Sequence, residues 1–145
     1  MRTRRTVATL SVMLIALVAA SVRAEDVSWM AAVSGNWNDG TKWVVGHAPV
    51  AGDDVFIQVP GTYTVTLNGN TALLGSLTVG NATGTQTIAF SSGGTSKWIS
   101  SMGTVSLNTG GVFTANQDND ARLILNGAGT DLVMNGGAID MSTGR

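Results

Sequence analysis

Thr64–Gly69 reads T-V-T-L-N-G, in which alternating aliphatic residues are followed by asparagine and glycine, and this phrase returns three times. The returns are V-S-L-N-T-G-G at Val105–Gly111, L-I-L-N-G at Leu123–Gly127 and L-V-M-N-G-G at Leu132–Gly137. Alternating Val, Leu and Thr favour a half-buried strand, while Asn and Gly favour sharp turns because both tolerate a left-handed backbone. The phrase therefore predicts a short strand followed by a corner at four places.

The spacing of the phrase favours a solenoid over other all-β folds. The last aliphatic residue of each copy is Leu67, Leu107, Leu125 or Met134, at offsets of 40, 18 and 9 along the chain. These offsets are close to multiples of one short unit, so we expect strands of about 9–10 residues each in coils of roughly 20 residues. A solenoid stacks equivalent positions on one another, so asparagines at its corners would form a ladder. The ladder residues would be Asn68, Asn108, Asn126 and Asn135.

Strand candidates recur from residue 54 onward, separated by turns rich in Gly, Asn and Ser. They are Asp54–Val59, Thr62–Leu67, Ser76–Val79, Thr87–Phe90, Lys97–Ile99, Thr104–Leu107, Val112–Thr114, Arg122–Leu125, Asp131–Met134 and Ala138–Met141. No stretch after residue 24 has apolar residues at helical spacing, so we predict almost no helix. We therefore predict an all-β protein with a right-handed parallel β-helix, and the alternative is a β-sandwich.

The N-terminal segment 1–24 is typical of a secretory signal peptide. Arg2, Arg4 and Arg5 precede an apolar run over 7–20, and Val22–Ala24 places small residues at the −3 and −1 positions of a cleavage site. The run is too short for a membrane-spanning helix, which needs about 20 residues. We therefore expect a mature chain that is secreted or held at the cell surface and does not insert into the membrane.

The mature chain is mildly acidic and has no cysteine. Without the segment 1–24, four basic and nine acidic residues remain, which gives a net charge of −5. Nucleic acids and anionic membranes bind clustered Lys and Arg, so we exclude both as partners. Stability must come from packing and backbone pairing, because no disulfide can form.

The segment 29–57 differs from the rest in carrying three of the four tryptophans. These are Trp29, Trp37 and Trp43. A solenoid exposes a strand edge and its core at each end, and large aromatic side chains could cover both. We interpret the segment as an N-terminal cap in which Asp39, Asp53 and Asp54 accept backbone N–H bonds. The alternative is a carbohydrate-binding site at Trp37 and Trp43, since aromatic faces stack on sugars.

The cap segment also resembles the opening of large secreted bacterial β-solenoid proteins. The pattern G-N-W-x-D-x-x-x-W-x-x-G-x-x-P-x-x-x-D-x-V-x-I spans Gly35–Ile57, and G-T-Y-T-V-T-L and L-G-S-L-T-V-G-N follow it. It is similar to autotransporter-like passenger regions and planctomycete-type surface proteins over Trp29–Asn81. The resemblance implies a β-solenoid with a surface or adhesin-like role.

The predicted organisation has three parts: a signal peptide over 1–24, a cap and first strand over 25–57, and solenoid coils over 58–145. The last strand candidate lies close to Arg145, and no aromatic or polar cap follows it. An open strand edge recruits further strands. We therefore expect either a truncated protein with further coils or end-to-end self-association.

One loop carries a weak calcium-binding pattern. Asn116, Asp118 and Asp120 alternate oxygen-bearing side chains of the kind that Ca²⁺ prefers. The loop lacks the glycine of a sharp calcium-binding turn and a following bidentate glutamate. We therefore favour a solvated loop and expect no cofactor.

Catalysis is not expected from this sequence. His47 is the only histidine and no G-x-S-x-G is present, so a zinc site or a catalytic triad has little support. Asp131 and Asp140 would supply the two carboxylates of a glycoside hydrolase if they stacked on one face, but nothing else supports this role. We expect a structural or adhesin-like protein that is not an enzyme, with surface glycans or further solenoid coils as partners. The alternative is a carbohydrate-binding or polysaccharide-degrading module.

Overall fold

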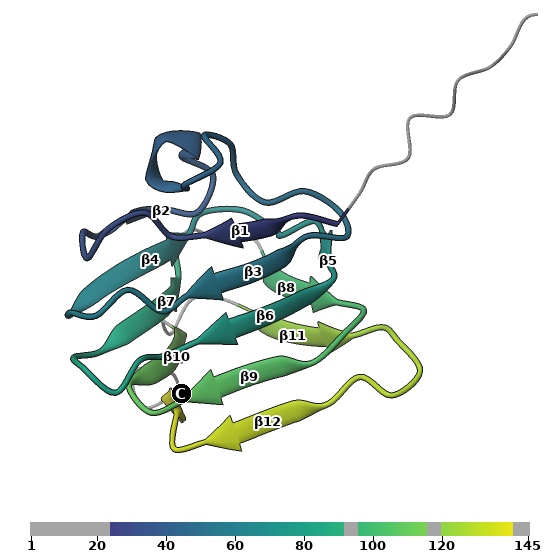
Figure 1. Cartoon of the computed structure of the whole chain (residues 1–145). Coiled ribbons are helices and arrows are strands. Elements are labelled where there is room, and N and C mark those ends of the chain that lie inside the picture. Colours follow the sequence, from purple (N-terminus) through teal and green to yellow (C-terminus); the bar gives the residue numbers. More distant parts are fainter. Residues whose placement is uncertain (1–23, 92–95, 116–119, 141–145) are drawn as a thin grey trace, which may run out of the picture.

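The computed structural model shows parallel sheets stacked into a β-solenoid of about 4 turns (Figure 1). It describes residues 24–91, 96–115 and 120–140. The predicted signal peptide up to Arg23, the calcium candidates Asn116 and Asp118 and the C-terminal segment 141–145 lie outside these ranges. The predicted parallel β-helix is confirmed, because all strand pairs within the sheets are parallel.

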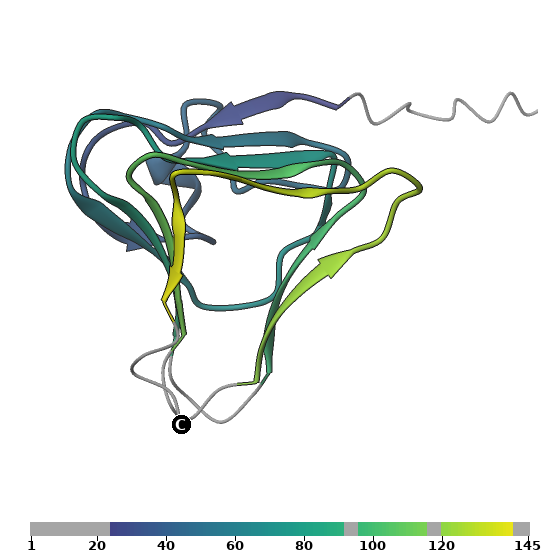
Figure 2. The same cartoon turned by 90° about the horizontal axis from the view of Figure 1, so that it is seen from below.

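Three sheets form the sides of a triangular cross-section (Figure 2). The first sheet contains β1 (Asp26–Ser28), β3 (Asp54–Ile57), β6 (Ser76–Val79), β9 (Val105–Asn108) and β12 (Leu132–Asn135). The second contains β2 (Gly35–Asn36), β4 (Tyr63–Leu67), β7 (Gln86–Phe90), β10 (Gly111–Ala115) and β13 (Ala138–Asp140). The third contains β5 (Leu73–Leu74), β8 (Lys97–Ser101) and β11 (Ala121–Leu125). The short 3₁₀ turn η1 (Gly40–Lys42) precedes β3, and among the described residues no helix is long and apolar enough to cross a membrane.

The coils are longer than the period expected from the sequence. Asp54 pairs with Ser76 in the next coil of the first sheet, while Gly35 pairs with Val65 in the second sheet, across a still longer interval. The short period was wrong because the recurring phrase marks the ends of strands in three different sheets. Its copies lie at β4, β9, β11 and β12, and only β9 and β12 pair with each other.

Alternation along each strand builds the core. In the first sheet Val27, Val55, Leu77 and Val105 occupy one register column, and each side chain is 0% exposed. The neighbouring positions along each strand point outward and are polar or partly exposed. Burying one such aliphatic side chain stabilises the fold by roughly 1.5–3 kcal/mol, so the inward columns hold the stack together.

Glycines stack at the corner that joins the first sheet to the second. Gly61, Gly84 and Gly110 have φ angles of 137°, 84° and 82°, which favour glycine. A Cβ on Gly84 would overlap the backbone of Gly61, and one on Gly110 would overlap the carbonyl oxygen of Gly84. This corner therefore requires glycine both for its turn and for the close approach of successive coils.

Candidate interaction surfaces

The tryptophan cluster closes the N-terminal end of the solenoid. Trp43 packs edge-to-face on Trp29 and on Trp37, with ring centroids 4.9 Å and 5.1 Å apart. Trp29 also stacks over Tyr63 of the first full coil at 6.4 Å. Figure 1 shows the loop that carries η1 above β1 and β2, so the predicted cap is present at this end of the stack.

The same segment covers the upper strand edges with backbone hydrogen bonds. At the end of β1, the N–H of Val44 donates to the carbonyl oxygen of Ser28 at 2.9 Å. Just beyond β1, the N–H of Met30 donates to the carbonyl oxygen of Lys42 at 2.8 Å. For β5, the N–H of Gly52 donates to the carbonyl oxygen of Leu73 at 2.9 Å. These bonds occupy groups to which a further strand would otherwise pair.

The aspartates of the cap segment bind different partners. The buried Asp53 carboxylate accepts the backbone N–H of Val50 at 2.7 Å and that of Glu25 at 3.3 Å. Asp54 instead accepts the hydroxyl of Ser76 at 2.7 Å, so the expected backbone bond to its side chain was wrong. Asp53 thus ties the start of β1 to the loop before β3, while Asp54 links two coils.

The alternative interpretation of Trp37 and Trp43 as a carbohydrate-binding site is wrong for these two residues. Their side chains are 1% and 0% exposed, so neither ring has a face open to a sugar. The indole Nε1–H of Trp43 is also occupied, because it donates to the carbonyl oxygen of Trp37 at 2.8 Å. Burial in the cap and ligand stacking are mutually exclusive here.

Of the four asparagines predicted to form a ladder, one pair is stacked and hydrogen-bonded. Asn108 and Asn135 are register partners, and the Nδ2 of Asn135 donates to the Oδ1 of Asn108 at 3.2 Å. Asn126 donates to the hydroxyl of Ser100 at 2.8 Å, whereas Asn68 is exposed at the end of β4. The larger ladder fails because the four residues lie at the ends of strands in three different sheets.

The remaining candidates for chemistry do not form a site. Asp131 precedes β12 in the first sheet and Asp140 lies in β13 of the second, so these carboxylates do not stack on one face as a glycoside hydrolase site would require. The exposed His47 has its Nε2 3.6 Å from a carboxylate oxygen of Glu25. In the ranges that the structure describes, no three His, Cys, Asp or Glu residues are grouped to hold a metal ion.

Asp120, the described member of the calcium pattern, is engaged by neighbouring side chains. It pairs with Arg122 and accepts the hydroxyl of Ser96 at 3.2 Å. The hydrogen bond from Arg122 is the main cause that lowers the pKa of Asp120 below its usual range. The Asp120 carboxylate therefore already has a cationic partner in the folded chain.

The C-terminal coil, made of β11, β12 and β13, is open by comparison with the cap. Leu132 and Met134 continue the inward columns below the buried Val105 and Leu107. They are nevertheless 37% and 45% exposed, because no described coil lies beneath them. Ile139 of β13 is likewise 44% exposed below Phe113. We call this surface the open coil.

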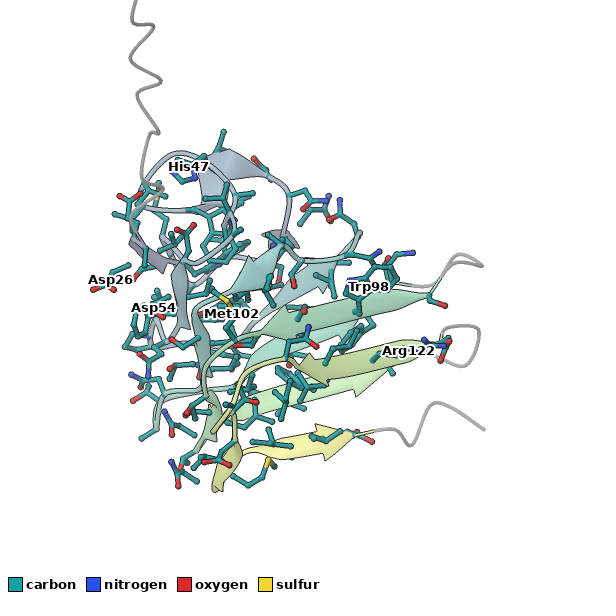
Figure 3. The ribbon with its side chains drawn as sticks, turned by 90° about the vertical axis from the view of Figure 1, so that its right-hand side faces the viewer. Asp26, His47, Asp54, Trp98, Met102 and Arg122 are labelled. Atoms are coloured by element: carbon teal, nitrogen blue, oxygen red, sulfur yellow. The ribbon has the colours of Figure 1, made fainter. Side chains whose placement is uncertain are left out.

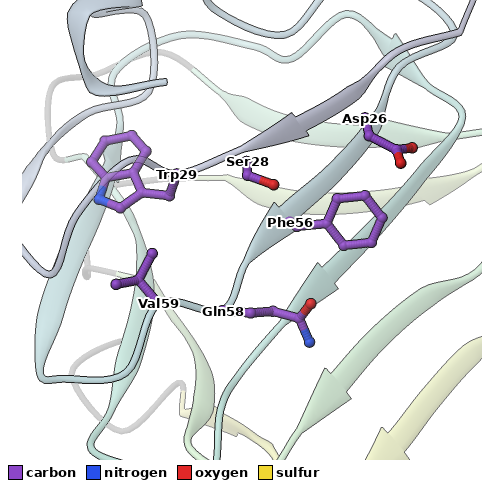
Figure 4. A pocket seen from close by; sticks show the side chains of 6 residues that line it. All are labelled: Asp26, Ser28, Trp29, Phe56, Gln58 and Val59. Atoms are coloured by element: carbon purple, nitrogen blue, oxygen red, sulfur yellow. The ribbon is translucent and has the colours of Figure 1, made fainter. Parts of the chain in front are cut away.

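A hollow of about 300 Å³ lies at the outer face of the first sheet, near the cap. We call it the Phe56 hollow; it is lined by Asp26, Ser28, Trp29, Phe56, Gln58 and Val59. Figure 4 shows the Phe56 ring between the side chains of Asp26 and Gln58. Figure 3 shows Asp26 and Asp54 on the same side of the molecule, opposite Trp98 and Arg122. Sequence reasoning missed this hollow, although the alternation in D-V-F-I was sufficient to place Phe56 outward.

The comparisons with known proteins found no relative of this chain. No family model, no curated protein and no solved structure matches the chain.

Proposed function

We propose that this protein is a secreted or cell-surface structural element, adhesin-like and without catalytic activity, that extends through its open coil. The observation that carries the proposal is the difference between the two ends. The cap covers the core with buried tryptophans and occupies upper strand edges with hydrogen bonds. At the other end, inward positions of β12 and β13 remain exposed.

The open coil favours the addition of further β-strands. Exposed strand edges pair readily with other strands, and natural proteins cover or charge them when association is unwanted. Here the outermost strands β12 and β13 expose Leu132, Met134 and Ile139 together with their edges. Added strands would bury these side chains, either as further coils of the same protein or as those of a second copy.

Self-association of the segment 25–145 tests the structural role. We expect the purified mature chain to associate as its concentration rises, measured by light scattering or analytical ultracentrifugation. Met134→Lys should weaken association because it places a charge at the inward position of the open coil. Val44→Lys is the matched control, since Val44 is 62% exposed at the capped end. A wild-type chain that stays monomeric, or equal effects of both variants, would contradict the proposal.

The proposed location rests on the segment 1–24 and has its own test. Fused to a reporter enzyme that is active only after export, this segment should direct it out of a bacterial cytoplasm. The N-terminus of the exported product should be Glu25. Replacement of Leu14 and Leu17 by Asp should abolish export, because it interrupts the apolar run. Retention of the unaltered fusion in the cytoplasm would contradict the proposed location.

A further inference from the structure

The Phe56 hollow combines an apolar floor with a polar rim. Phe56 lies between Val55 and Ile57, which are both 0% exposed in the core, so its own side chain points outward. It occupies the same register column as Ser28 above and Thr78 below, which are small polar residues. An aromatic side chain at this position gains little from the core, and Figure 4 shows the broad side of its ring facing the viewer.

The rim presents hydrogen-bonding groups that the fold leaves available. Within the described residues, no hydrogen bond occupies the side-chain oxygens of Asp26 or Ser28. The Nε2 of Gln58 donates to the carbonyl oxygen of Gly80 at 3.4 Å, which leaves its Oε1 as an acceptor. Binding sites for small molecules typically pair an apolar surface with a few convergent polar groups of this kind.

The chemistry of the hollow selects among ligand classes. Its one charged side chain is the Asp26 carboxylate, and Asp54 is the register partner of Asp26 on the next strand. Two neighbouring carboxylates disfavour anionic ligands, including acidic polysaccharides and phosphates. Hydroxyl-rich ligands instead donate to carboxylate and amide oxygens, while the C–H face of a sugar ring packs on an aromatic side chain.

We infer that the Phe56 hollow binds a short, uncharged oligosaccharide, with a sugar ring stacked on Phe56 and its hydroxyl groups donating to Asp26 and Gln58. This inference rests on the proposed adhesin-like role for its biological setting. It adds the class of ligand and places the site on the outer face of the first sheet. The site is separate from the open coil, so association and sugar binding can be measured independently.

The test uses the segment 25–145 and neutral oligosaccharides of glucose, mannose and N-acetylglucosamine, with oligogalacturonate as the anionic comparison. Binding is followed by chemical-shift changes of backbone amides or by calorimetry. We expect at least one neutral oligosaccharide to bind and to shift amides of β1 and β3. Phe56→Ala should weaken its binding about tenfold, since it removes the aromatic surface on which the sugar ring stacks. Phe56→Tyr should keep it.

Thr78→Ala is the matched control, because Thr78 lies in the same outward column one coil below Phe56. It should leave binding unchanged, and circular dichroism should report the same fold for all variants. The inference is overturned if no neutral oligosaccharide binds at millimolar concentration, if Phe56→Ala binds as well as the wild type, or if oligogalacturonate binds better. Light scattering on the same samples separates this result from a failure of the proposed self-association.

Discussion

Trp43 and Trp37 hold each other in place at the capped end of the solenoid. The indole Nε1–H of Trp43 donates to the carbonyl oxygen of Trp37 at 2.8 Å, and the two rings meet edge-to-face with centroids 5.1 Å apart. Trp43 also contacts Trp29 edge-to-face. One side chain therefore connects the residue after β1, the turn after β2 and the segment that covers the first coil, so the cap should be lost as a unit.

Removal of the Trp43 side chain should destabilise the whole domain. Trp43→Ala leaves a cavity among buried rings and frees the carbonyl oxygen of Trp37, so we expect a loss of about 3–5 kcal/mol in the free energy of unfolding. Urea denaturation followed by circular dichroism measures it. Trp98→Ala is the control because Trp98 is only partly buried in β8. If both variants lose the same free energy of unfolding, Trp43 in the cap contributes no more to stability than the partly buried Trp98.

Tyr63 should make stability fall at high pH. Burial of the hydroxyl group raises the pKa of Tyr63 to about 12. The unfolded chain loses this proton near pH 10, so the folded state binds more protons between about pH 10 and 12 and stability decreases over that range. Tyr63→Phe should remove this part of the decrease, as measured by urea denaturation at pH 8 and pH 11. An unchanged difference between the two pH values would contradict the assignment.

The same substitution should be tolerated at neutral pH. Within the described residues, the hydroxyl of Tyr63 is buried without a partner in hydrogen-bond geometry. Replacing an unsatisfied buried polar group by hydrogen removes its desolvation cost. We therefore expect Tyr63→Phe to be as stable as the wild type or more stable at pH 7. A large loss of stability would reveal a hydrogen bond in solution that stabilises the native chain.

The glycine corner should be sensitive to a single methyl group. In Gly84→Ala, the new residue must adopt a left-handed backbone and its Cβ overlaps Gly61. The loss in the free energy of unfolding should therefore exceed the roughly 1–2 kcal/mol that the left-handed backbone alone costs. Gly46→Ala measures the cost of the left-handed backbone alone, since Gly46 also has a φ of 84° and a Cβ there would meet nothing within 4 Å. Thermal unfolding of both variants gives the comparison. If they are equally destabilised, close approach of the coils contributes nothing.

Gln86 should act as a buried connector of this corner. Its Oε1 accepts the N–H of Asn81 at 2.6 Å, and its Nε2 donates to the carbonyl oxygens of Gly61 at 2.5 Å and Thr83 at 3.1 Å. Gln86→Met should therefore cost at least about 2 kcal/mol, because each buried group left unpaired costs roughly 1–3 kcal/mol. Chemical denaturation measures the loss. Gln58→Met, at a partly exposed position, should be nearly neutral.

The sequence was sufficient to predict the strands in which apolar and polar residues alternate strongly. Ser76–Val79 has the predicted bounds, because apolar and hydroxyl residues alternate there between two glycines. The short strands β1, β2 and β5 were missed, since such brief segments carry no periodic signal. β8 continues past its predicted end at Ile99, because Ser100 and Ser101 are buried although they are polar.

Local sequence patterns did not determine which strands pair. The Asn–Gly phrase is a general way to end a strand, so its recurrence identified corners without assigning them to a sheet. Coil length also varies within one column, because the interval from Val55 to its partner Leu77 is shorter than that from Leu77 to Val105. Insertions at corners change the interval while leaving the inward columns in register. A fixed period therefore could not be found.

The parallel stacking also determines how chain length becomes physical length. A whole coil, such as the stretch from Asp54 to its partner Ser76, adds only one inter-strand spacing to the height of the body, which is about 4.8 Å. An α-helix gains about 1.5 Å from every residue, so the same stretch of chain would reach several times further. Each coil added at the open coil would thus lengthen the body only slightly and would leave its cross-section unchanged. Deleting or adding one coil would change the height by one fixed increment. The length of such a protein is therefore set by its number of coils.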